Sequence, residues 1–65
     1  MTKSNTEIQL NCFLIEAMVR ELVLRGTTNN EELVAAVGDR FNPKNEWEME
    51  VYSEAIIFAK HSVMN

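Results

Sequence analysis

The sequence has few of the residues that stabilise small proteins by means other than a hydrophobic core. Its 65 residues include one cysteine, one histidine, one proline and two glycines. A single cysteine excludes an intrachain disulfide, and one cysteine with one histidine is too few for a Cys/His zinc site. Because a domain of this length has a marginal core and usually needs a disulfide, a metal or a partner subunit, we expect oligomerisation to supply that support.

Basic residues are also scarce. Six Lys and Arg stand against ten Asp and Glu, for a formal net charge of −4. Nucleic acids and anionic membrane surfaces both attract basic patches, so we do not expect this chain to bind either directly. No run approaches the ~20 apolar residues of a membrane span, and the opening MTKSNTE lacks the apolar core of a signal peptide. With the lone thiol, which suits a reducing compartment, these features predict a cytoplasmic protein.

Catalytic motifs are missing as well. The sequence contains no glycine-rich phosphate loop, paired cysteines or Ser/His/Asp set. Cys12 lies on an apolar helical face with no base nearby in sequence, so we interpret it as a small buried hydrophobe and not as a nucleophile. His61, alone near the end of a helix, is interpreted as a solvated residue favoured by the helix dipole, and not as a general base or pH switch. We predict no enzymatic activity, no cofactor and no metal.

What the sequence does have is a long apolar stretch over residues 8–24, in which 12 of 17 residues are apolar. Ser4 and Glu7 precede it with the spacing of a capping box, in which each side chain reaches the other's free backbone N–H. No glycine or proline interrupts the stretch before Gly26, which suits the left-handed residue after a helix. The pattern predicts a helix over residues 5–25.

Two further helices are predicted, over residues 30–41 and 45–63. Asn29 with Glu32, and Asn45 with Glu48, repeat the capping spacing. Proline at 43 ends the second helix. Within that helix Gly38 either costs ~1 kcal/mol relative to Ala or permits close packing against another helix. The prediction is therefore one all-α domain over residues 1–65, with a long, a short and a long helix.

The first helix has two apolar faces where a surface helix needs one. At 100° per residue, one face carries Ile8, Cys12, Ile15, Val19, Leu22 and Val23, and the roughly opposite face carries Leu10, Phe13, Leu14, Ala17 and Leu24. The third helix is apolar over more than half of its circumference. Two short partners can hardly cover both faces, so we expect a helical homodimer. The expected dimer or partner interface comprises Leu10, Phe13, Leu14, Ala17, Leu24, Tyr52 and Ile56.

Glu46, Glu50 and Glu54 form an acidic stripe at i, i+4 and i+8 of the third helix. Like charges at this spacing repel by a few tenths of a kcal/mol per pair. The stripe is either a solvated face or a docking site for a basic partner.

Several short motifs resemble the YmgB/AriR family of small enterobacterial biofilm and acid-resistance regulators. They are the run Ala17–Gly26 (AMVRELVLRG), Asn29-Asn30, Leu33-Val34 with Val37, and Val51-Tyr52 with Ala55-Ile56-Ile57. The chain departs from the family pattern at Glu31, where the family has lysine, and at Arg40-Phe41, where it has Leu-Glu. The resemblance implies an all-helical dimer that connects signalling proteins in a stress or biofilm response, with possible DNA association, which the acidic charge of this chain opposes.

Two functions from different classes follow. The first is a non-enzymatic regulatory interaction protein, a helical dimer that binds a signalling or transcription protein. The second is a small acidic inhibitor, encoded by a phage or plasmid, that uses the stripe of Glu46, Glu50 and Glu54 against the basic groove of a host nucleic-acid machine.

Overall fold

Three helices make up the fold. The computed structural model describes residues 4–64, in which α1 spans Asn5–Leu24, α2 spans Asn30–Phe41 and α3 spans Glu46–Met64. The predicted all-α class is confirmed, and each predicted helix end lies within one residue of the observed one. The described residues include no β-strand.

The capping residues explain where α1 and α3 begin. The backbone N–H of Glu7 donates to Ser4 Oγ at 3.1 Å, and the backbone N–H of Glu48 donates to Asn45 Oδ1 at 2.9 Å. Each bond satisfies one of the N–H groups that the first turn of a helix leaves without an internal partner. Both starts were predicted from the spacing of these residues.

An asparagine lies at each end of α2. Asn29 is the N-cap, but its Oδ1 accepts from the backbone N–H of Glu31 at 2.8 Å and does not form the predicted pair with Glu32. At the other end Asn42 takes a left-handed conformation, with φ of 47°, directly before Pro43. Asparagine tolerates this conformation better than most residues, and proline cannot continue the helix.

A glycine-dependent turn ends α1. Gly26 has a φ of 103°, and its backbone N–H donates to the carbonyl of Val23 at 3.0 Å. The backbone N–H of Thr27 donates to the carbonyl of Leu22 at 2.9 Å. These two bonds define a Schellman motif, which satisfies the last carbonyls of the helix and turns the chain toward α2.

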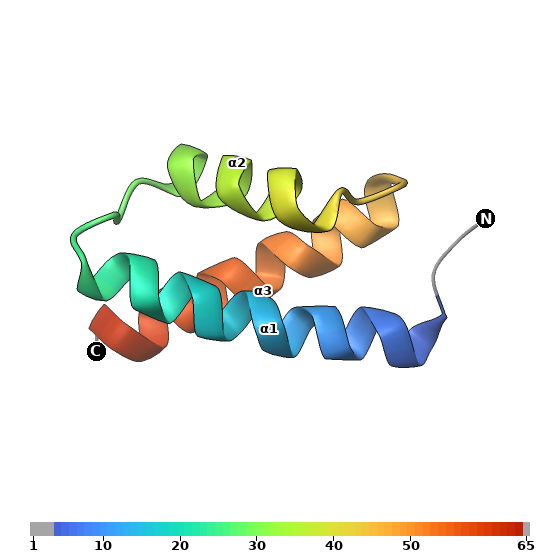
Figure 1. Ribbon diagram of the computed structural model, residues 1–65, viewed down its shortest axis with the longest axis horizontal. Coiled ribbons are helices and arrows are strands. Elements are labelled where there is room, and N and C mark those ends of the chain that lie inside the picture. The colour runs from blue at the N-terminus through green and yellow to red at the C-terminus, as the bar shows by residue number, and fades with distance from the viewer. Residues whose placement is uncertain (1–3, 65) are drawn as a thin grey trace.

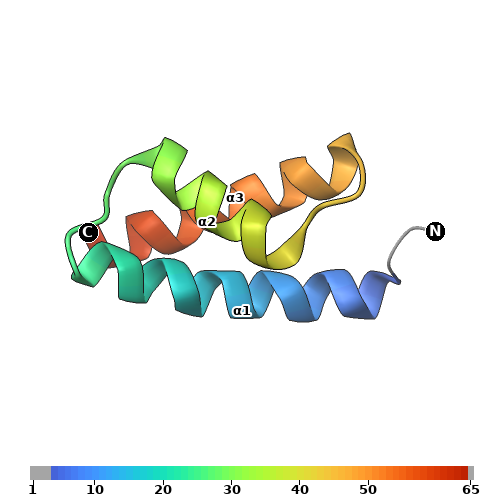
Figure 2. The ribbon, with the colours of Figure 1, turned by 45° about the horizontal axis from the view of Figure 1, so that its top comes forward.

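The helices α1 and α3 form a pair, and α2 lies against one side of it. In Figure 1 both α1 and α3 run from the right of the view to the left. The helix α2, which comes between them in the sequence, runs in the opposite direction. Figure 2, from a second direction, again shows α2 on one side of the pair. Neither α2 nor α3 covers the side of α1 that faces away from α2. The chain thus covers the α1–α3 pair on one side only.

The core lies where the three helices meet. Its apolar residues are almost fully buried and come from every helix: Ile8, Ile15, Val19 and Val23 of α1, Leu33 and Val37 of α2, and Tyr52, Ala55, Ile56 and Ala59 of α3. Their spacing fits the i, i+3, i+4 and i+7 pattern, which places them on one face of each helix. The core face of α1 is therefore the first of its two apolar faces.

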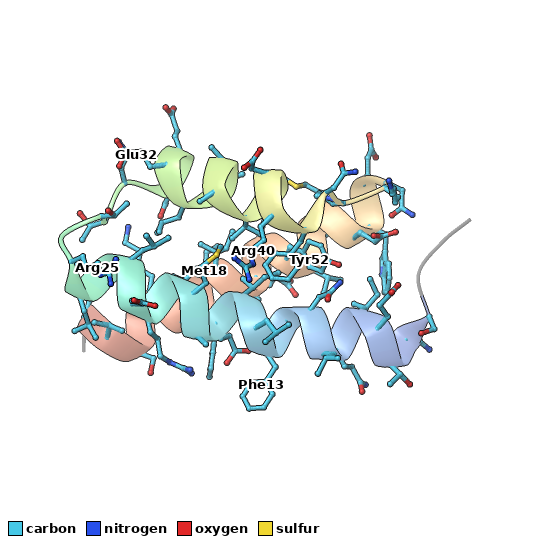
Figure 3. All side chains as sticks on the ribbon, in the orientation of Figure 1. Phe13, Met18, Arg25, Glu32, Arg40 and Tyr52 are labelled. Carbon is cyan, nitrogen blue, oxygen red and sulfur yellow. The ribbon has the colours of Figure 1, made fainter. Side chains whose placement is uncertain are left out.

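Tyr52 joins all three helices. Its side chain is fully buried, its ring meets the ring of Phe41 edge-on at a centroid distance of 6.2 Å, and its hydroxyl accepts a hydrogen bond from Asn11 Nδ2 at 2.9 Å. Figure 3 shows its side chain between the helices. Burial of an aromatic ring together with its hydroxyl partner makes this residue the best anchored in the core.

Alanine is expected to have opposite effects on stability at the two glycines, Gly26 and Gly38. A Cβ added at Gly38 would meet no atom within 4 Å, so this glycine does not serve close helix packing, which was one of the two alternatives. We expect Gly38→Ala to raise the free energy of unfolding by ~0.5–1 kcal/mol, because alanine loses less backbone entropy in a helix.

Urea unfolding followed by circular dichroism measures this change. Gly26→Ala serves as the control, and we expect it to destabilise the protein by ~1 kcal/mol or more, because φ of 103° strains an L-residue even where space is free. Equal effects of the two substitutions would contradict the account of the turn.

Candidate interaction surface

The second apolar face of α1 lies in solvent. Leu10 is 58% exposed, Phe13 67%, Leu14 52% and Leu24 75%, and Ala17 is also exposed. We call these five residues the α1 stripe. Figure 3 shows Phe13 pointing away from α2 and α3. The sequence left open which face of α1 is available to a partner, and the structure shows that it is this one.

Two ion pairs lie along the α1 stripe, and one of their members, Glu21, lies on the stripe itself between Ala17 and Leu24. Arg20 Nη2 lies 3.2 Å from Glu16 Oε1, and Arg25 Nη2 lies 2.8 Å from Glu21 Oε1. Both pairs have the i, i+4 spacing, with the acid nearer the helix N-terminus, which is the favourable order. Each exposed pair contributes little to stability, but within each pair the two charges offset each other.

Two residues predicted for the interface are not on this surface. Tyr52 is fully buried and Ile56 is 2% exposed, both within the core of the single chain. A partner cannot contact them without unfolding α3 from α1, so Tyr52 and Ile56 are removed from the predicted interface, and the five residues of the α1 stripe stay a prediction. The helical wheel placed Tyr52 and Ile56 on an apolar face, but it did not show that α1 and α2 cover that face.

A groove between α1 and α3 continues the exposed apolar surface. It is open to solvent, has a volume of about 620 Å³, and is lined by Asn5, Ile8, Gln9, Cys12, Phe13, Glu16, Trp47 and Val51. Phe13 thus belongs to both the α1 stripe and the groove. Trp47 is 55% exposed, and Phe58 follows on the same flank of α3 at 62%. The apolar surface therefore extends from α1 across the groove onto α3.

Cys12 lies in the wall of the groove and is half-buried. Burial, and secondarily the negative charge of Glu16, raise the pKa of its thiol above the ordinary value. A raised pKa lowers the thiolate fraction at neutral pH, and the thiolate is the nucleophilic form. The environment of Cys12 therefore favours its predicted role as a small hydrophobe.

The acidic residues of α3 divide into two groups. Glu46, Glu50 and Glu54 are exposed, as expected of a solvated or docking stripe, and the structure gives them no ion pair with a base within residues 4–64. Glu48 is instead fully buried: Lys44 N–H donates to its Oε1 at 3.3 Å and Asn45 Nδ2 donates to its Oε2 at 3.2 Å. Sequence reasoning missed this burial, because it treated Glu48 only as a capping residue.

A second, smaller pocket lies at the end of α3. It has a volume of about 380 Å³ and is lined by Asn30, Ile57, Lys60, His61 and Met64. Lys60 Nζ donates to Asn30 Oδ1 at 3.0 Å, which ties this end of α3 to the start of α2. His61 is exposed. Across the described part of the chain, no group of three or more His, Cys, Asp or Glu residues is placed to hold a metal ion.

A comparison with protein families, with curated proteins and with solved structures finds no match to this chain. The resemblance to the YmgB/AriR family therefore stays an expectation from short motifs. Within residues 4–64, none of the helices combines the length and the apolar character needed to cross a membrane.

The environment of Cys12 predicts a pH dependence. Because the pKa of its thiol is raised in the folded protein, the unfolded chain loses the thiol proton first as pH rises through about 8.5. The folded state then binds more protons than the unfolded state, so we expect stability to fall as pH rises above this value. Ellman's reagent at pH 8 should accordingly react more slowly with the native protein than with the urea-unfolded chain.

Cys12→Ser is the control for the stability measurement, because serine does not titrate in this range. We expect the variant to lose the part of the alkaline decline that the thiol causes. A native thiol that reacts as fast as the unfolded one would contradict the assignment.

Proposed function

We propose that this protein is a non-enzymatic regulatory interaction protein, which forms a homodimer through the α1 stripe and binds a signalling or transcription protein. The observation that carries the proposal is the exposure of Leu10, Phe13, Leu14 and Leu24 on one side of a helix whose other side is the core. Contiguous apolar surface of this kind on a soluble protein marks an interaction site.

The size of the α1 stripe supports a second copy as its occupant. Side chains of this size present about 150–200 Å² each, so the exposed fractions of the four large residues amount to roughly 450 Å². Interfaces are ~60% apolar, so this area corresponds to about 750 Å² for each partner, close to the ~800 Å² of a standard interface. A two-fold dimer would cover one such stripe with another.

The groove beside the α1 stripe is where we place the target protein. Phe13 and Trp47 line the groove with large, partly exposed aromatic side chains, the residue type that dominates binding energy at interfaces. The groove is concave and lies between two helices, so it suits an apolar helix of the target. The net charge of −4 disfavours nucleic acid as that target.

The dimer proposal predicts different effects for two equally exposed residues. Leu14 in the α1 stripe is 52% exposed, and Ile57 on α3, outside the stripe, is 51% exposed. We expect Leu14→Asp to weaken self-association at least tenfold, or ~1.4 kcal/mol, because in each copy it removes a leucine from the interface and takes a carboxylate out of water.

Light scattering after size exclusion, over a micromolar concentration series, measures the change. Ile57→Asp is the matched control, with the same added charge and the same exposure, and we expect it to associate as the unaltered chain does. A folded monomer for the unaltered chain throughout the series would reject the dimer. Equal weakening by both substitutions would reject the α1 stripe as its interface.

A second candidate function rests on the exposed stripe of Glu46, Glu50 and Glu54, which has no ion-pair partner among residues 4–64. It is inhibition of a host nucleic-acid machine by a phage- or plasmid-encoded protein that docks in a basic groove. Such an inhibitor, expressed in its host, would reduce incorporation of labelled nucleosides.

We expect Glu46→Lys/Glu50→Lys/Glu54→Lys to abolish this inhibition with the helical content unchanged, because reversed charges would repel the groove. Retained inhibition in the triple variant would reject this candidate.

A further inference from the structure

We infer that the second copy binds with its α1 antiparallel to the first, in a register that places Ala17 of the two chains face to face on the two-fold axis. This inference rests on the proposed dimer and adds its orientation and register. It follows from the positions of Leu10 and Leu24 on either side of Ala17 and from the charges along the helix.

The two outermost residues of the α1 stripe are symmetric about Ala17. Leu10 precedes Ala17 by seven residues and Leu24 follows it by seven, which is close to two helical turns in each direction, or roughly 10 Å. An antiparallel pair centred on Ala17 therefore brings each Leu10 against the partner's Leu24. The small side chain at the centre lets the two helix backbones approach closely, so that the leucines on either side come into contact.

The same register accommodates the other residues of the stripe. Leu14 then lies opposite the partner's Arg20, and Phe13 opposite the partner's Glu21. The aliphatic stem of each charged residue can cover an apolar side chain while its charged end stays in water, where the Glu21 carboxylate keeps its bond to Arg25 at 2.8 Å. The Arg20 guanidinium keeps its bond to Glu16 of its own helix, at 3.2 Å, which lies away from the centre of the stripe. All four large apolar residues of the stripe lose solvent exposure in this arrangement.

Charge disfavours the parallel alternative. An in-register parallel pair sets every residue opposite its own copy, so Glu21 would face the partner's Glu21, and Arg20 the partner's Arg20. Like charges directly opposite each other destabilise an interface. The antiparallel register separates the two copies of Glu21 by eight residues along the helix and those of Arg20 by six, or roughly 12 Å and 9 Å. It also opposes the two helix dipoles.

Disulfide trapping in a Cys12→Ser background tests the orientation. Positions 10, 17 and 24 are exposed, so cysteine at each leaves the core unchanged. Under a glutathione redox buffer we expect Ala17→Cys to form a covalent dimer, since residues on the two-fold axis meet the short Cβ–Cβ distance that a disulfide requires. A mixture of Leu10→Cys and Leu24→Cys chains should form the mixed dimer, and Leu10→Cys alone should stay reduced.

The outcomes separate this inference from the proposed function. A disulfide in Leu10→Cys alone would show a parallel pair and overturn the inference, as would failure of Ala17→Cys to cross-link while light scattering of the reduced protein shows a dimer. A reduced protein that is monomeric would overturn the dimer itself, and with it the inference, and would leave the α1 stripe to a different partner.

Discussion

Three helices in 65 residues can enclose only one side of a long helix, and this constraint shapes the whole molecule. The α1 helix carries apolar residues on two opposite faces, and both α2 and α3 pack on the same one. Because α2 and α3 pack on the same face of α1, Tyr52 contacts both Phe41 of α2 and Asn11 of α1. A single buried residue thus links the three helices. The opposite face is left to solvent, and its Phe13 points away from α2 and α3.

The exposed apolar face lowers the stability that the monomer could otherwise reach. Each apolar residue left in water forgoes a stabilisation of the order of 1.5–3 kcal/mol that burial would supply. A domain of this length has a total stability of only several kcal/mol. The α1 stripe therefore represents stabilisation comparable to that of the whole fold, and a second copy that covers it would couple folding to association.

Much of this structure was predictable from local patterns. Capping pairs at Ser4 and Asn45, and the glycine at 26, defined helix ends because the groups they satisfy are backbone groups a few residues away. The spacing of apolar residues identified the two faces of α1, because the helical period alone decides which residues share a face. The corrections concern distant contacts. Tyr52 and Ile56 were assigned to a partner because a helical wheel shows that a face is apolar but not which neighbour covers it.

The burial of Glu48, a charged residue, also could not be predicted from local patterns. Its burial depends on how the loop before α3 folds over the helix start, where backbone and side-chain N–H groups of Lys44 and Asn45 bond both of its carboxylate oxygens. The capping spacing distinguishes Glu48 from Glu46 and Glu50, but it predicts a helix start and not the burial of the carboxylate. The groove that joins Phe13 to Trp47 is also a product of tertiary packing, since its walls lie more than 30 residues apart in the sequence.

The central claim is that the α1 stripe is covered in solution by a second copy of the chain. Hydroxyl-radical footprinting of the unaltered protein tests it most directly, with the oxidation rate of each residue divided by its rate in the urea-unfolded chain. We predict that Phe13 and Leu14 become protected as the protein concentration rises, while Ile57, which is equally exposed in the single chain, keeps its rate. Oxidation of Phe13 at a rate that stays high at every concentration would contradict the account.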